Sequence, residues 1–195
     1  MANLQYFDMI ETGFVARIVG IDMIIDKVYN NNIVQLIGEN KEEIIAMGRG
    51  IGFQKKPGQS IDDTQVEKWF VPQNQKVSDD ISTVYSDLSE QEVEAVLAII
   101  QLGQKELEMT FDAALYIALA DHIHYTIERI QDGFSINNPL SWEIRKFYPK
   151  EYTVGQKALD IIKDKLNINL PSDEGSSIAL HLINAQKDSG MVEKN

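Results

Sequence analysis

The chain has 195 residues, no cysteine and a formal net charge of −12. A chain without cysteine forms neither a disulfide nor a thiolate metal site, and it suits a reducing compartment, so we expect a cytoplasmic protein. The charge is uneven, because residues 79–195 carry 10 Lys/Arg against 20 Asp/Glu whereas residues 22–78 carry 7 against 8. Since an acidic surface repels a polyanion, any nucleic-acid site is expected within residues 22–78.

Residues 1–22 match neither the strand pattern nor the helix pattern of the rest of the chain. A start at Met23 would place a strand directly after the initiator, so we interpret the preceding segment as an appended tag or, equally well on composition, as a genuine N-terminal extension. Its apolar run is interrupted by Arg17 and Asp22, and it lacks the basic start of a signal peptide. We therefore expect no insertion into a membrane.

Residues 23–72 predict a small antiparallel sheet. Four strands rich in β-branched and aromatic side chains are expected, at residues 23–29, 33–38, 43–48 and 65–71. Three asparagines, Asn30 to Asn32, separate the first two strands and tolerate the positive φ of a tight hairpin turn. A sheet of about fifty residues has a small core of its own, so we expect this module to dimerise.

The spacing of apolar residues changes to a helical period after residue 89. The polar and acidic residues 79–88 are interpreted as a linker. Ser89 and Glu92 then form a capping-box pattern ahead of an apolar stripe, which predicts the start of the first helix.

Further helices are expected through residues 113–130, on both sides of a break at Pro149, and after Pro171 with Ser172 as the N-cap. The predicted fold class is therefore α+β with two domains, a four-stranded sheet followed by an all-α bundle. The predicted boundaries are 23–78 for the sheet domain, 89–187 for the bundle and 188–195 for a C-terminal tail.

The segment AMGRGIGFQKKPG, residues 46–58, places four glycines and three cations beside one aromatic residue. Arg49 offers a planar fork of donors for phosphate or base edges, and Phe53 can stack on an unpaired base. A plainer interpretation is a loop that joins two strands and carries solvated cations, and composition alone favours it. The glycine spacing matches neither a Walker nor a Rossmann motif.

The three histidines give a weak signal for chemistry. His122 and His124 are two residues apart on a predicted helix, so they face different directions and cannot chelate one ion together. His181 belongs to another helix, and a half-buried, hydrogen-bonded histidine is the usual case. The functional alternative is that His122 and His181 project into one groove as nucleophiles or phosphate acceptors. We find no catalytic set in the sequence, so no enzyme, metal or cofactor is expected.

Three stretches, KVYNNNIV (27–34), AMGRGIGFQKKPG (46–58) and VEKWFV (66–71), resemble the co-antiterminator (CAT) RNA-binding domain of the BglG/SacY family of bacterial sugar-operon antiterminators. The resemblance implies a sheet that dimerises face to face. The dimer would clamp a hairpin in nascent messenger RNA, not DNA, and so prevent an overlapping terminator from forming. Carried over by position, the implied RNA contacts are Lys27, Asn30, Asn32, Gly48, Arg49 and Phe53.

The helical part resembles the first phosphotransferase-system regulation domain (PRD) of the same family. The matching stretches are ADHIHYTIERIQDG (120–133), NPLSWEIRKFYPKEYTVGQKAL (138–159) and LPSDEGSSIALHLINAQ (170–186). The resemblance implies that His122 and His181 accept phosphate from sugar phosphotransferase proteins, whereas His124 does not match the pattern.

Full-length members of this family carry a second regulation domain, so the resemblance predicts that this chain is a truncated form. Two rival hypotheses stay open at this point. One is a phosphohistidine-regulated sensor or interaction protein that binds no RNA. The other, which the weak metal signal disfavours, is a metal-dependent hydrolase that uses the histidines.

Overall fold

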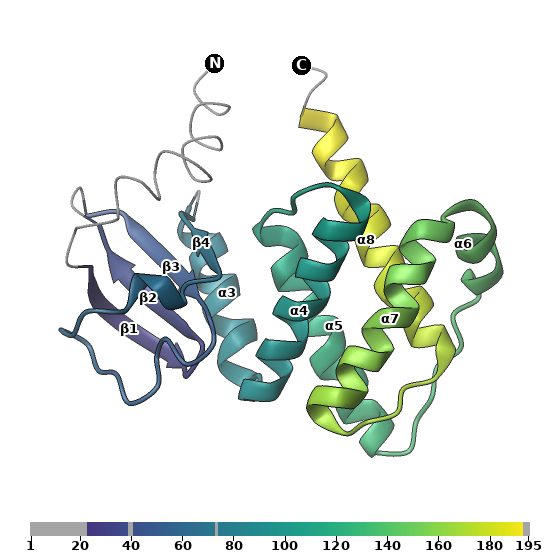
Figure 1. Cartoon of the computed structure of the whole chain (residues 1–195), viewed down its shortest axis with the longest axis horizontal. Helices are drawn as coiled ribbons and strands as arrows, with labels where there is room; N and C mark the ends of the chain where they lie inside the picture. Colours follow the sequence, from purple (N-terminus) through teal and green to yellow (C-terminus); the bar gives the residue numbers. More distant parts are fainter. Residues whose placement is uncertain (1–22, 39–40, 73, 193–195) are drawn as a thin grey trace. The chain divides into compact units, whose positions relative to one another are not determined.

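The computed structural model describes residues 23–38, 41–72 and 74–192, with side chains as far as Gln186. The chain divides into two compact units, one up to Ser86 and one from Asp87 (Figure 1). The described part of the first unit holds a four-stranded sheet and a helix, and that of the second holds five helices. The predicted α+β class with two domains is confirmed. The interpretation of residues 1–22 lies outside the described residues.

All neighbouring strands of the sheet are antiparallel, in the order β1-β2-β3-β4. The strands are β1 (Ile24–Asn30), β2 (Ile33–Ile37), β3 (Glu43–Met47) and β4 (Lys68–Phe70). The predicted strands are therefore all present, and the fourth is shorter than its sequence pattern. The pairing of β1 with β2 shifts register twice, between Ile25 and Lys27 and between Val28 and Asn30.

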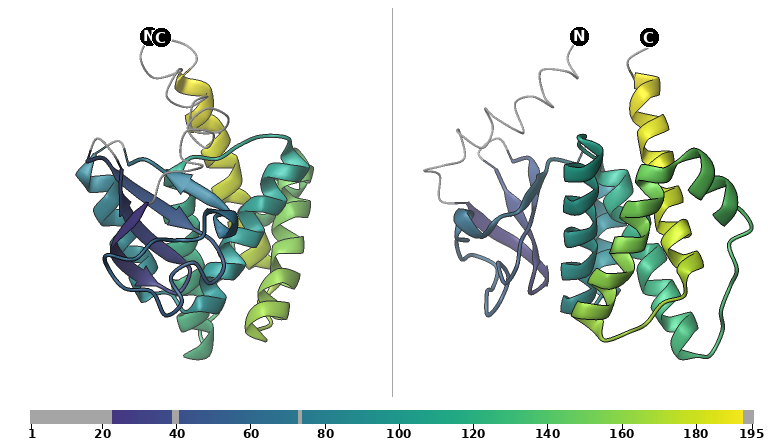
Figure 2. Two further views of the ribbon diagram at one scale, coloured as in Figure 1. Left: turned by 60° about the vertical axis from the view of Figure 1, so that its left-hand side comes forward. Right: turned by 45° about the vertical axis from the view of Figure 1, so that its right-hand side comes forward.

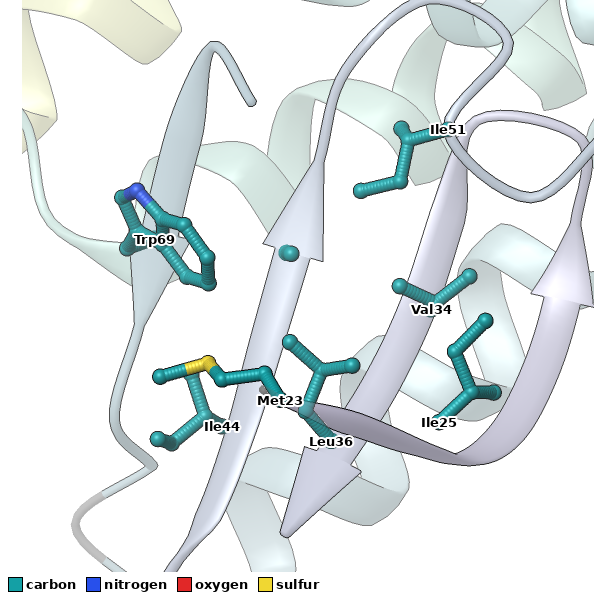
Figure 3. Packing of buried hydrophobic residues seen from close by; sticks show 8 residues of the cluster. Met23, Ile25, Val34, Leu36, Ile44, Ile51 and Trp69 are labelled. Carbon is teal, nitrogen blue, oxygen red and sulfur yellow. The ribbon is translucent and has the colours of Figure 1, made fainter. Parts of the chain in front are cut away.

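One face of the sheet packs into an apolar core (Figure 3). The core comprises Met23, Ile25, Val34, Leu36, Ile44, Ala46, Ile51 and Trp69. The long β3–β4 connection contains the short 3-10 helix η2 (Asp63–Gln65) and returns to the free edge of β1. There the Ile25 N–H donates to the Gln59 carbonyl at 2.9 Å, and Gly58 N–H donates to Ile25 at 2.8 Å. The connection, which carries the glycine loop (residues 46–58), is thereby held against the edge of the sheet at Gly58 and Gln59.

Residues 79–88, predicted as a linker, instead form most of helix α3 (Gln75–Asp87). Ile81 and Tyr85 are four residues apart and fully buried, so they form an apolar stripe that the many acidic and hydroxyl side chains around them conceal in the sequence. The helix lies against the second face of the sheet, where Ser78 Oγ donates to Glu43 Oε2 at 2.7 Å.

The second unit is a four-helix ring with one short helix added. Its helices are α4 (Glu90–Leu107), α5 (Ala113–Gln131), α6 (Ser141–Phe147), α7 (Pro149–Leu166) and α8 (Ser172–Val192). Helix α4 packs on α5 and α7, and α8 packs on the same two helices, which closes the ring (Figure 2). Helix α6 packs on α7 and α8. No helix in the described ranges is long and apolar enough to cross a membrane.

The helix ends confirm two of the sequence signals and correct two others. The capping box of Ser89 and Glu92 is present, and Pro149 is at the start of α7. Ser172, predicted as an N-cap, is the first residue of α8 and its hydroxyl donates to Gln156 Oε1 at 3.2 Å. Helix α8 continues to Val192, into the segment predicted as a tail.

Candidate functional sites

The glycine loop is fastened to the β1–β2 turn through Asn32, whose side chain is fully buried. Its side-chain Oδ1 accepts a hydrogen bond from the Gly50 N–H at 2.8 Å, and its carbonyl accepts one from the Gly48 N–H at 2.9 Å. Its own N–H donates to Asn30 Oδ1 at 2.8 Å. Asn32 thus forms hydrogen bonds with backbone groups of the loop and with the turn while buried beneath them. It therefore positions the loop and is not an exposed contact residue.

At two positions of the loop, another segment of backbone lies so close that only glycine fits. A Cβ atom on Gly48 would lie 2.0 Å from the carbonyl oxygen of Gln65, and one on Gly52 would lie 2.4 Å from that of Asn30. Gly50 has a φ of +72°, the left-handed region that favours glycine. The loop therefore has one tightly specified path across the end of the sheet.

Arg49 and Phe53 are both exposed in this loop, and Phe53 keeps 57% of its surface accessible. Between them Ile51 is buried in the sheet core, which anchors the middle of the loop. The Arg49 N–H donates to Glu67 Oε1 at 3.3 Å. An exposed phenylalanine on a backbone fixed in this way can offer a ring face to a base, and an exposed arginine can offer its fork to phosphate.

The two remaining predicted contacts, Lys27 and Asn30, face helix α3. Lys27 Nζ donates to Ser82 Oγ at 3.2 Å and lies 4.9 Å from the centre of the Tyr29 ring. Asn30 Nδ2 donates to the Tyr85 carbonyl at 2.9 Å. The structure thus brings Asn30, Asn32 and the glycine loop together at one end of the sheet, whereas Lys27 lies further along β1.

The second candidate site is the facing surface of α5 and α8. The rings of His122 and His181 lie with their centroids 4.8 Å apart and their planes tilted by 51°. Two residues predicted from the sequence to share a groove are therefore in contact. One helical stripe on α5 continues from His122 to Arg129, and one on α8 leads from His181 back to Glu174, so the two helices run in opposite directions.

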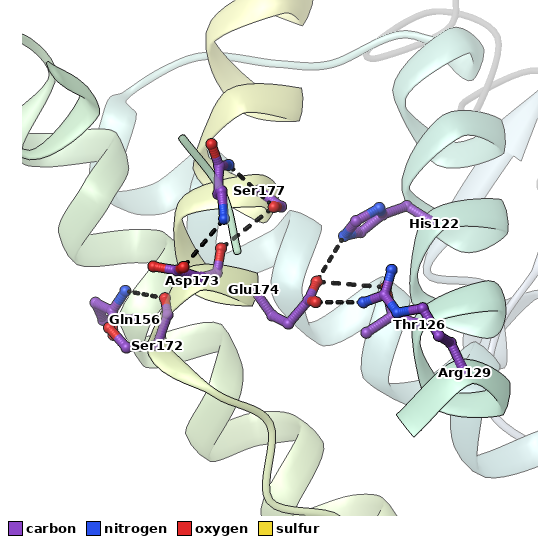
Figure 4. A network of polar contacts seen from close by, with 9 residues as sticks. His122, Thr126, Arg129, Gln156, Ser172, Asp173, Glu174 and Ser177 are labelled. Carbon is purple, nitrogen blue, oxygen red and sulfur yellow. Dashed lines mark hydrogen bonds and ion pairs between the residues drawn. The ribbon is translucent and has the colours of Figure 1, made fainter. Parts of the chain in front are cut away.

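Glu174 is the centre of this second site and is only 3% exposed (Figure 4). Its carboxylate accepts a hydrogen bond from Arg129 Nη2 and one from Thr126 Oγ1 at 3.4 Å, and it lies 3.6 Å from His122 Nε2. Burial raises the pKa of this carboxyl, but His122 and Arg129 outweigh burial and leave the pKa below its usual value. Glu174 is therefore an ionised, buried carboxylate whose charge is offset by Arg129.

His181 is largely buried beside His122. Burial first, and then the neighbouring His122, lower its pKa from 6.5 to about 4, while Asp121 acts weakly in the opposite direction. The His181 ring is therefore neutral at pH 7, which leaves one ring nitrogen with a lone pair.

His124, which does not match the family pattern, has a local role in the fold. Its Nδ1 lies 2.7 Å from Glu92 Oε1, and the other oxygen of Glu92 accepts the Ser89 N–H of the capping box at 2.6 Å. Burial lowers the pKa of His124, but Glu92 outweighs it and the pKa is raised. His124 thus ties α5 to the start of α4. Within the described ranges, no three His, Asp or Glu side chains gather as a metal site.

Comparison with known proteins matches two family models to this chain, the CAT RNA binding domain over residues 23–79 and the PRD domain over residues 97–185. A solved structure described as GlcT CAT-PRDI superposes with a TM-score of 0.76 at 31% identity, covering 84% of this chain and 97% of that chain. The chain belongs to the BglG/SacY family of bacterial antiterminators. The predicted resemblance is confirmed, and the family is one of RNA-binding regulators rather than of enzymes.

Two relatives of this family illustrate the similarity. The beta-glucoside operon antiterminator of Dickeya chrysanthemi is 41% identical over 171 residues, which is 88% of this chain and 60% of that protein. The transcription antiterminator LicT of Bacillus subtilis (strain 168) is 37% identical over 169 residues, 87% of this chain and 61% of that protein. The chain therefore spans about three fifths of the length of these relatives.

The sequence patterns indicated both histidines of the second site but not Glu174. The acidic neighbour of His122 in the sequence, Asp121, is exposed, whereas the carboxylate beside the His122 ring is on another helix. A signal was present, because Thr126 and Arg129 follow His122 at helical spacing and Glu174 precedes His181 by two turns. Charged residues on an apolar face are expected to be paired.

Proposed function

We propose that this chain is a cytoplasmic RNA-binding antiterminator of a sugar-utilisation operon, controlled by histidine phosphorylation through the sugar phosphotransferase system. The observation that carries the proposal is the combination of a rigidly held loop with exposed Arg49 and Phe53 in the first unit and a contacting pair, His122 and His181, in the second. The CAT and PRD family models that match these two units support it.

In this proposal the loop edge reads an RNA hairpin. Arg49 would bind phosphate or a guanine edge, and Phe53 would stack on an unpaired base, as RNA-binding proteins commonly do at loops and bulges. Asn32 and Gly48 act indirectly, because both are buried and hold the loop backbone in place. Asn30 and Lys27 take part once their hydrogen bonds to α3 are exchanged for bonds to RNA.

The RNA-binding unit is proposed to act as a homodimer. The second face of the sheet carries buried Ile33, Ile45 and Met47, and α3 lies along this face through its contact with Glu43. A fragment of residues 23–74 lacks α3 and would expose that apolar face, so it should dimerise at micromolar concentration. A fragment of residues 23–86 keeps α3 and should dimerise less tightly. Sedimentation of both fragments checks this, and a folded monomer for residues 23–74 contradicts the dimer.

Phosphorylation would act on the second unit through charge. The acceptors His122 and His181 lie in a part of the chain that is already strongly acidic. The nearby cation Arg129 is already paired with Glu174. A phosphoryl group adds nearly two negative charges, so it would raise repulsion between facing copies of this unit and reach RNA binding indirectly.

The test of the proposed function is binding of the full chain to a panel of hairpins that overlap terminators. Arg49→Ala should weaken binding to the preferred hairpin by on the order of 1–3 kcal/mol, because one arginine contact to nucleic acid is worth about that much. Lys76→Ala removes the same charge from an exposed position on α3 and is the matched control. If the parent binds no hairpin while His122 accepts phosphate, the alternative of a phosphohistidine-regulated protein without RNA binding is favoured instead.

A further inference from the structure

The two nitrogens of the His122 ring have different surroundings. Nε2 is fully buried, has no hydrogen-bond partner and lies 3.6 Å from the Glu174 carboxylate. The side chain as a whole is 21% exposed. Because Nε2 has no accessible surface, Nδ1 is the nitrogen of this ring that remains for an incoming group (Figure 4).

We propose that Glu174 is a positioning residue for phosphoryl transfer, and that it holds the proton of neutral His122 on Nε2 so that Nδ1 carries the lone pair that attacks phosphorus. This inference rests on the proposed role of His122 as a phosphate acceptor. A buried carboxylate beside one ring nitrogen favours the tautomer with hydrogen on that nitrogen, and the second nitrogen is then the nucleophile.

The transfer step needs no change in protonation at Nε2. The Nδ1 lone pair forms a bond to the phosphorus of an N-phosphoryl donor, the donor P–N bond breaks, and its electron pair leaves with the donor nitrogen. When the donor carries a proton on its nitrogen group before transfer, that group leaves as a neutral amine or imidazole. The His122 ring becomes a phosphorylated imidazolium that still carries hydrogen on Nε2, and its new positive charge lies next to ionised Glu174.

The groups around His122 favour this assignment to Glu174. His181 contacts the ring but is neutral at pH 7, and Asp121 is exposed on the neighbouring position of α5. Arg129 and Thr126 both donate to Glu174, which keeps the carboxylate ionised and fixed on its side of the ring. Among the described residues, Glu174 is the acid within ion-pair distance of His122.

The first measurement reads the tautomer directly, with no phosphate present. In the parent chain labelled with 15N-histidine, NMR at pH 7 should show His122 with hydrogen on Nε2 and a lone pair on Nδ1. In Glu174→Gln the amide can donate to Nε2, so hydrogen should move to Nδ1. An Nδ1-protonated ring in the parent, or an unchanged ring in the variant, overturns the proposal.

The second measurement uses phosphoramidate, a small donor that releases ammonia when its P–N bond breaks. The parent should form Nδ1-phosphohistidine at residue 122, and Glu174→Gln should form it at least about 100-fold more slowly, since removing one group that stabilises developing charge at a reacting centre costs about 10²–10³-fold in rate. Glu106→Gln is the control, because it removes a carboxylate paired with Lys157 on the same unit and should not change the rate.

Glu174→Gln takes the charged partner from Arg129, so a second variant separates an effect on the fold from an effect on the transfer. The double variant Arg129→Gln with Glu174→Gln removes both charges and should show the same tautomer and the same slow transfer in a folded protein. The role of Glu174 and the role of His122 as phosphate acceptor are tested by different outcomes. Equal rates in parent and variants, or an Nε2-linked phosphate, overturn the role of Glu174 alone. A parent that takes no phosphate on His122 overturns the proposed acceptor and with it this inference.

Discussion

The glycine loop and the histidine pair hold their candidate residues by different means. In the loop, Arg49 and Phe53 are exposed, and backbone hydrogen bonds to Asn32 fix the chain between them. In the pair, both rings are largely buried, and side-chain charges on Glu174 and Arg129 determine their surroundings. A binding edge needs a rigid backbone beneath accessible side chains, whereas a site that responds to added charge needs buried groups in electrostatic balance.

The largest expected effect tests whether the second site depends on charge balance. Arg129→Met leaves Glu174 buried without its partner, which should destabilise the second unit by roughly 3–5 kcal/mol. Adding Glu174→Leu removes the unpaired charge and should restore most of that loss. Urea unfolding of the three proteins measures both effects. Equal stability of Arg129→Met and the parent would mean that the pair contributes nothing to the fold.

The next effect tests whether the loop depends on its backbone path. Gly48→Ala places a Cβ against the Gln65 carbonyl and should destabilise the first unit by about 3 kcal/mol, the upper end for overpacking. Gly50→Ala meets no atom within 4 Å and is strained only by its φ, so it should cost about 1–2 kcal/mol. Denaturation of an isolated fragment of residues 23–86 compares them. A reversed order would contradict the role of close approach at Gly48.

The third effect is a pH dependence confined to the histidine pair. The pKa of His181 is lowered to about 4 in the folded chain. As pH falls, the unfolded chain therefore binds a proton on this histidine near pH 6.5, whereas the folded chain does so only near pH 4. Stability should therefore fall as pH drops, by about 2 kcal/mol between pH 6.5 and about pH 5. His181→Gln should flatten this slope. The raised pKa of His124 has the opposite effect, because it lowers stability as pH rises above 6.5. The lowered pKa of Glu174 affects stability only at lower pH, where the carboxylate is protonated.

Thermal unfolding of parent and His181→Gln at several pH values measures the difference. The His124 contribution is common to both proteins and cancels in the comparison. A slope between pH 6.5 and pH 5 that is the same in both proteins would show that His181 is not the group held neutral by the fold.

Much of the architecture was determined by local sequence. The strands, the capping box of Ser89 and Glu92, and the start of α7 at Pro149 depend on residue period and on short-range hydrogen bonds, which neighbouring residues specify. The family resemblance also located the loop and both histidines. Helix α3 escaped prediction because two buried side chains, Ile81 and Tyr85, decide it among many polar residues.

The tertiary structure alone decided which groups meet. Asn32 is a turn residue by sequence, yet its burial beneath the loop makes it a support for Gly48 and Gly50. Glu174 is 52 positions from His122 and reaches it only because α5 and α8 pack against each other. Partners of this kind depend on helix packing, which brings together residues distant in the chain, so no local pattern of residues specifies them.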